Sequence, residues 1–292
     1  MFRIRYLLYS ILCVWLASDS QAALAPVSRP VSLISASCAC EKMPGDLYDP
    51  SLQFNFGHYS GQCVDTCLFR SAKILSVERD RVRIANLLHL DRFYVAEIPI
   101  NAIIEVDVGF EEFLTGISHV YLRFRFSQPV RLSPGDLETS DVIISAEGVP
   151  PKGERYKFVE SSLGRYLHAY RILSVEEARA RMVKRLHHSI KQFKLSLTPE
   201  QQRRLLLNGL ARSESHSFNT KYDLLTNNCA TSAVDLLSDQ LKTHPSVDWW
   251  NRFERGLPIE GYYGTFPFML QWGLIASPEL SRIPNLETEA SS

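Results

Sequence analysis

The chain has 292 residues, of which 45% are hydrophobic and 22% are charged, so it can bury a core as one large domain or as one domain with a small companion. Its 32 Lys and Arg residues balance its 32 Asp and Glu residues. A neutral chain has no overall field that attracts polyanions, which excludes binding of nucleic acid or of an anionic membrane by charge alone.

The N-terminus has the pattern of a secretory signal peptide. Arg3 and Arg5 precede an apolar run over residues 6–17, and small residues around Ala22 suit cleavage. The run is about a dozen residues, whereas a helix needs roughly 20 to span a bilayer core. We therefore expect a signal peptide over 1–22, cleaved near Ala22, in preference to an uncleaved anchor. The mature chain is expected in the periplasm, without a transmembrane helix.

Export changes what the cysteines are expected to do. A cluster of four favours two disulfides in an oxidising compartment: Cys38, Cys40, Cys63 and Cys67. A bond between near neighbours is geometrically awkward, so we favour pairing across the two halves of the cluster. The alternative is a four-thiolate zinc site, although its spacings depart from the usual two-residue gaps. Cys229 is left over, as a free thiol or an intermolecular link.

Strand patterns dominate the first half of the mature chain. After a loop-rich stretch rich in Ser, Pro and Gly, residues 73–78 and 81–84 read as a hairpin, and 93–98 and 103–108 as two more strands. Residues 119–126 alternate, with apolar side chains on one face and polar ones on the other. Shorter strands are expected at 142–145 and 166–173. We take residues 23–108 as a small disulfide-linked β segment.

Helical patterns follow. A capping box at Ser174–Glu177 opens a run with helical spacing through Phe193, which predicts a long helix that carries His187 and His188 on a solvated face. Thr198-Pro199-Glu200 opens a second helix. Asn227 or Asn228 can cap a third, which begins beside Cys229. Residues 279–292 are polar and are expected to be disordered.

The position of Cys229 suits a nucleophile. In the first turn of a helix, the unpaired backbone N–H groups and the helix dipole favour an anion, and a basic partner lowers the thiol pKa further. The same N–H groups can hold an oxyanion. The alternative is a buried structural cysteine.

A thiol nucleophile needs a base, and two histidines are candidates. His119 begins a strand with one clean apolar face, so the sheet would hold its ring rigidly. His58, which follows Gly57, is the other candidate. A structural role for either histidine stays open at this stage.

A family resemblance bears on this choice. The stretch Thr226–Thr231, with its Asn-Asn-Cys sequence before a helix, resembles the signature of the Lnb-type N-terminal periplasmic domain family. Residues 117–124 are similar to that family's serine–histidine segment, and Ser145-Ala146-Glu147 with residues 152–156 is similar to its serine-x-glutamate and glycine–glutamate stretch. The resemblance covers about residues 100–275. His58 is similar to a variant of the family pattern.

The resemblance implies a fold and a mechanism. The family is similar to circularly permuted NlpC and papain-like thiol enzymes, which implies an α+β fold: an antiparallel sheet with helices packed on one side, over residues 109–278. It implies that His119 deprotonates Cys229, that Glu147 orients the histidine, and that Asn227 and Asn228 belong to the substrate or oxyanion site. No cofactor and no metal are expected in the site.

The function implied is an exported hydrolase or acyltransferase that works through a thioester. Its expected substrate is an envelope lipid, a lipoprotein or a peptidoglycan peptide, with membrane proximity possible and no nucleic acid as partner. An aromatic-rich stretch over residues 262–272 can line an acyl groove or pack in the core. The alternative function is a non-catalytic envelope module for binding or assembly that retains the fold.

Overall fold

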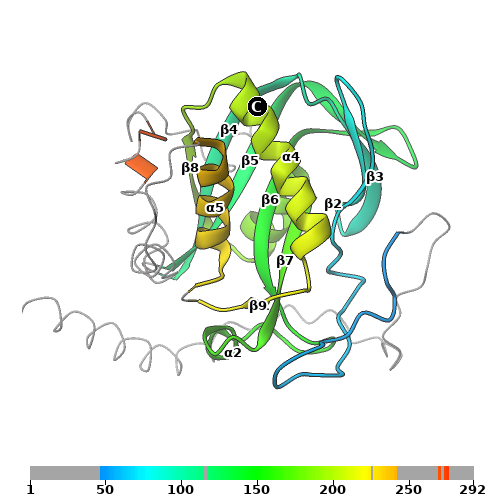
Figure 1. Ribbon diagram of the computed structural model, residues 1–292, viewed down its shortest axis with the longest axis vertical. Helices are drawn as coiled ribbons and strands as arrows, with labels where there is room; N and C mark the ends of the chain where they lie inside the picture. The colour runs from blue at the N-terminus through cyan, green and yellow to red at the C-terminus, as the bar shows by residue number, and fades with distance from the viewer. Residues whose placement is uncertain (1–46, 115–116, 225, 242–268, 271–272, 276–292) are drawn as a thin grey trace, which may run out of the picture. The chain divides into compact units, whose positions relative to one another are not determined.

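The structure, a computed structural model, describes residues 47–114, 117–224, 226–241, 269–270 and 273–275 (Figure 1). All of these belong to one compact unit, Cys38–Ser292. The expected signal peptide, the polar tail and most of the aromatic-rich stretch lie outside the described residues. Within the described part, none of the helices is both long enough and apolar enough to cross a membrane.

The strands form where the alternation predicts them. The expected hairpin is β1 paired antiparallel with β2, and each later strand pattern corresponds to one strand, several of them longer than the pattern. The strands are β1 (Lys73–Val77), β2 (Val82–His89), β3 (Arg92–Ile98), β4 (Ile103–Leu114), β5 (Ile117–Ser133), β6 (Leu137–Val149), β7 (Tyr166–Ser174), β8 (Ser189–Lys194) and β9 (Lys221–Tyr222).

The sheet closes on itself, which corrects the expected fold class. Strands β2, β3, β5, β6 and β7 are neighbours in that order, and a parallel pairing of Leu88 with Leu173 joins β7 back to β2. The result is a mostly β fold around a closed five-stranded barrel, and the predicted α+β papain-like sheet is wrong. Closure removes the free edges that an open sheet would expose.

The longest strand, β5, carries the extensions of the barrel. Its first half pairs with β4 on one side and β6 on the other, and its last residues pair with β3. β4 in turn pairs with β8. β4 runs over Ile103–Leu114, so the boundary expected between residues 108 and 109 falls inside this strand.

The capping residues predicted the helix positions better than the spacing of apolar residues did. The helices are α2 (Phe158–Ser162), α3 (Val175–Ala178), the π-helical η2 (Arg179–Arg185), α4 (Pro199–His216) and α5 (Cys229–Leu241). Thr198 caps α4 with the full capping box, and Ser174 caps α3. The long helix predicted through Phe193 is wrong: it ends at Arg185, and Ile190 and Phe193 lie in β8, where they are buried.

Helical segments cover both faces of the strands. α4 and α5 lie side by side in front of β4–β7 (Figure 1), and they share the main core with residues such as Leu122 of β5. α3 and η2 pack against Tyr121, Ile143 and Leu173. Neighbouring residues of a strand point to opposite faces, so Leu122 and Tyr121 place the helices on two faces. The expectation of helices on one side is therefore also wrong.

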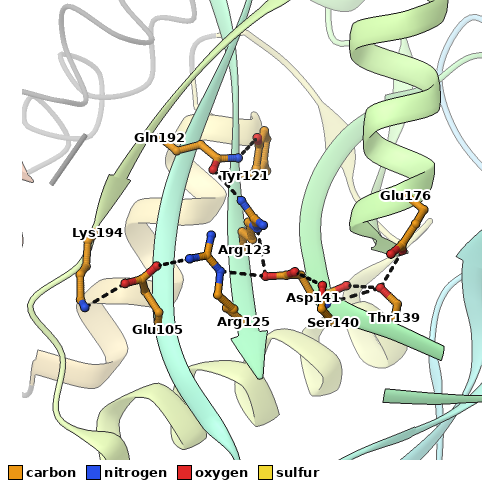
Figure 2. A network of polar contacts seen from close by, with 10 residues as sticks. All are labelled: Glu105, Tyr121, Arg123, Arg125, Thr139, Ser140, Asp141, Glu176, Gln192 and Lys194. Carbon is orange, nitrogen blue, oxygen red and sulfur yellow. Dashed lines mark hydrogen bonds and ion pairs between the residues drawn. The ribbon is translucent and has the colours of Figure 1, made fainter. Parts of the chain in front are cut away.

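The face of β5 that carries Tyr121 is also strongly polar (Figure 2). Arg123, which is 2% exposed, donates to Asp141 at 3.1 Å and to Gln192 at 2.8 Å. Arg125 links Asp141 to Glu105. A slip of one residue would place these charges in the apolar core, so the network fixes the register of β5. Since side chains alternate, His119 lies on this same face.

The segment before β1 packs against one end of the barrel. Phe54, Tyr59 and Val64 form a second core with residues of β7 and β9. Cys63 and Cys67 are disulfide-bonded, while Cys38 and Cys40 lie outside the described residues, so the cross-pairing stays a prediction. Disulfide-bonded sulfurs have no thiolate to give to zinc, which disfavours the zinc alternative.

Candidate active site

Cys229 is the first residue of α5 and carries a free, buried thiol. Asn228 builds the turn before it: its side-chain oxygen accepts from the backbone N–H groups of Ala230 and Thr231 at 2.9 and 3.0 Å. Its amide donates to the Leu224 carbonyl at 2.9 Å. Asn228 is therefore the helix cap, and its polar atoms are used in holding Cys229 at the helix start.

The sulfur of Cys229 lies near the point where strands β5 and β6 separate. β5 pairs with β6 from Tyr121 opposite Ser145, and the rest of β6 pairs with β7 alone. The backbone of Val120, next to this point, hydrogen-bonds to the sulfur of Cys229. The divergence of β5 and β6 thus frees a backbone donor for the thiolate.

His119 faces the same sulfur, and hydrogen bonds on the far side of its ring hold it in place. Its side chain hydrogen-bonds to Cys229, and its Nε2 lies 2.6 Å from the Ser145 hydroxyl. Ser145 donates to Glu147 at 3.2 Å, so its oxygen accepts from the histidine Nε2–H. This chain leaves Nδ1 as the ring nitrogen that can face the sulfur, which fixes both the ring and its tautomer.

Glu147 is buried and paired with two arginines. Arg171 donates to it at 2.9 Å, and Arg181 forms two bonds at 3.1 and 3.2 Å. Burial raises the pKa of Glu147, but the two guanidinium groups outweigh burial and hold that pKa well below its usual range. The carboxylate at the end of the serine link therefore stays ionised.

The sulfur and the imidazole stabilise each other's charged form. Burial alone would raise the pKa of the Cys229 thiol, yet His119, the Val120 backbone and Tyr222 lower it from its ordinary value. Burial would lower the pKa of His119, but the Cys229 charge raises it to about 9. Each charge therefore favours the other, so the two groups act as one coupled thiolate–imidazolium pair.

Tyr222 of β9 completes this group, and the sequence reasoning missed it. Its hydroxyl hydrogen-bonds to the sulfur, and its oxygen accepts from the backbone N–H of Cys229 at 3.4 Å. Burial and the nearby sulfur raise its pKa well above the ordinary value, so the hydroxyl keeps its proton. β9 has two residues, too few for an alternation pattern to reveal it.

A cavity of about 420 Å³ opens onto the sulfur. Cys229, His119, Glu147 and Tyr222 line it, together with an apolar wall of Leu68, Phe69, Phe113, Phe158, Leu186 and Leu224. Leu68 and Leu186 are 45% exposed, so the wall continues to the molecular surface. A group bound here would have its reacting carbonyl beside the sulfur and an apolar part along the wall.

The remaining residues expected in the site lie elsewhere. His58 is exposed and does not line the cavity. The Asn227 amide donates to Thr220 at 3.3 Å and to the Lys221 carbonyl, on the turn outside the cavity. The first three N–H groups of α5 all have acceptors: those of Ala230 and Thr231 donate to Asn228, and that of Cys229 donates to the Tyr222 oxygen.

His188 is placed differently from its expected solvated helix face. It follows η2, immediately before β8, and its Nδ1 lies 2.6 Å from Glu111 of β4. Both residues line the cavity. Within the described residues, no group of three or more His, Cys, Asp or Glu side chains is arranged to hold a metal ion.

Fold and site together define a β-barrel protein with a cysteine–histidine pair at a helix start. The model of the Lnb N-terminal periplasmic domain family matches residues 109–260, more than half of the chain. The chain therefore belongs to the Lnb N-terminal periplasmic domain family. No curated protein and no solved structure shows a significant match.

Proposed function

We propose that the protein is an exported cysteine-dependent hydrolase or acyltransferase, which acts on an ester or amide of the cell envelope through a thioester. The observation that carries this proposal is the contact of the Cys229 thiol with His119, whose far nitrogen is bound through Ser145 to Glu147. A thiol paired with an imidazole, which is oriented by a third polar group, is the arrangement that activates a nucleophile.

The reaction follows from the charges of the pair. The Cys229 thiolate attacks the carbonyl carbon, and the His119 imidazolium gives its proton to the leaving alcohol or amine. A thioester forms, and water or an amine then takes the acyl group and releases the sulfur as a thiolate. Glu147, ionised behind Ser145, stabilises the charged imidazole during the first step.

The oxyanion of each tetrahedral intermediate needs donors close to the sulfur. The Tyr222 hydroxyl is the group that the geometry offers, because the Cys229 N–H donates to the Tyr222 oxygen and the next two N–H groups of α5 donate to Asn228. Donors of this type typically contribute on the order of 3 kcal/mol to transition-state stabilisation.

The substrate is proposed from the cavity and from the family. The apolar wall supports an apolar acyl or side-chain group next to the reacting carbonyl. The family's periplasmic assignment and the signal-like segment at residues 1–22 support an envelope substrate: a lipid, a lipoprotein or a peptidoglycan peptide.

Thiol labelling tests the proposal. Iodoacetamide should alkylate Cys229 at pH 7 faster than a model thiol, and His119→Ala should slow that reaction by at least tenfold. His58→Ala is the matched control, because it removes an exposed imidazole outside the cavity and should leave the rate unchanged. Equal, slow labelling in all three proteins would instead support the alternative, a non-catalytic envelope module.

A further inference from the structure

The cavity holds a second acid–base pair that the first step does not use. Glu111 lies directly opposite His119 in the β4–β5 ladder, so their side chains share a face at a Cβ separation of about 5 Å. Glu111 accepts a hydrogen bond from His188 Nδ1 at 2.6 Å. Both side chains line the cavity that opens onto the Cys229 sulfur.

The local fold holds this pair in place. Glu111 is 6% exposed, and β4 fixes it between β5 and β8. His187, just before His188, has a left-handed backbone with φ of 56°, which ends η2 and starts β8. The His188 ring then packs beside Phe113, with ring centroids 6.0 Å apart. The side chain of His188 stays 23% exposed, so it can exchange a proton with solvent.

We infer that His188 is the general base for the second step, in which it takes the proton from the acyl acceptor, and that Glu111 positions it. The inference rests on the proposed function. His119 is tied to Ser145 on one side and faces the sulfur on the other, whereas His188 lines the same cavity from the β4–β8 side.

The step balances with water as the acceptor. Water attacks the thioester carbonyl while one of its protons moves to the free ring nitrogen of His188. The tetrahedral intermediate collapses, the carbon–sulfur bond breaks, and the products are the carboxylic acid and the Cys229 thiolate. The proton on His188 then passes to His119, which was left neutral by the first step, through water in the cavity that both rings line. The starting ion pair is restored.

The test separates formation of the acyl-enzyme from its breakdown. p-Nitrophenyl acetate serves as the probe: the burst of p-nitrophenol and the mass of the acylated protein report the first step, and steady-state release reports the second. His188→Gln and Glu111→Gln should keep a full burst and lower the steady-state rate by at least tenfold. Imidazole added to His188→Ala should restore part of that rate, which a purely structural role would not allow.

Controls keep the two proposals apart. His187→Asn removes the adjacent imidazole with a residue that tolerates the left-handed backbone, and it should leave both phases unchanged. No acyl-enzyme in the unmodified protein would refute the proposed function itself. A burst with unchanged turnover in His188→Gln would refute only the role of His188, and so would loss of the burst in that variant.

Discussion

Replacement of Ser145 by Ala tests the link behind His119 without changing any charge. Ser145 is fully buried, and its hydroxyl accepts from His119 at 2.6 Å and donates to Glu147 at 3.2 Å. A hydrogen bond to a charged partner contributes about 1.5–3 kcal/mol. Each pKa unit corresponds to about 1.4 kcal/mol, so the pKa of His119 should fall from about 9 to roughly 7–8.

The Cys229 thiolate should be destabilised by the same free energy. Below the thiol pKa, the rate of alkylation of Cys229 should fall by on the order of 10- to 100-fold. The assay is the pH dependence of iodoacetamide labelling, combined with an NMR titration of the His119 ring. The midpoint of the labelling profile and the midpoint of the His119 titration should shift together, because Cys229 and His119 titrate as one coupled pair.

A matched variant separates this effect from lost stability. Ser174→Ala breaks another buried serine–histidine bond, at 2.9 Å to His89, and also removes the cap of α3, away from the cavity. It should lower the free energy of unfolding by about 1 kcal/mol and leave the thiol reactivity alone. If Ser145→Ala titrates and labels like the unmodified protein, the serine link has no role in the ion pair.

Three further predictions concern stability. Gly109→Ala should lower the free energy of unfolding by about 1–3 kcal/mol in chemical denaturation. An added Cβ would overlap the Tyr121 ring, which is buried and whose hydroxyl accepts from Gln192 at 3.0 Å. An unchanged free energy of unfolding would mean that the ring can move. Asn228→Ala should cost about 0.5–2 kcal/mol, and Asn228→Ser should recover part of this; an equal loss in both variants would argue against the capping role. Asp107 is fully buried, with neither oxygen hydrogen-bonded among the described residues, and burial raises its pKa to about 7. Its charged form is therefore disfavoured in the folded state, so the free energy of unfolding should decrease as pH rises from about 4 to 7, and Asp107→Asn should flatten that decrease when denaturant melts are compared across this range.

The sequence by itself determined the local features. Strand patterns predicted the positions of β1–β7, although several strands are longer than the patterns, because apolar alternation and short apolar runs are visible within a strand's own residues. The cap at Thr198 is equally local, and so is the Asn227–Asn228 pair, within which the structure selects Asn228, since a cap bonds to residues two or three positions away. The resulting start of α5 at Cys229 followed from the same reasoning.

The helical spacing of apolar residues gave a wrong prediction after Met182, where strand pairing decides the local structure. The apolar residues from Met182 to Phe193 fit a helical period, yet Ile190 and Phe193 lie in β8, paired with β4. A short apolar pattern is compatible with both periods, and the free edge of β4 decided between them. That edge belongs to another part of the chain, so no local signal could report it.

Only the tertiary structure decided the barrel and the full site. Closure depends on Leu88 meeting Leu173. The site depends on Tyr222 of β9, Glu111 of β4 and His188, which precedes β8, lining one cavity, and on Ser145 of β6 holding His119 there. These contacts join residues far apart in the chain, and each alone is an ordinary serine, tyrosine, glutamate or histidine. Their chemistry arises from their distances and burial, which are set only when the strands have paired.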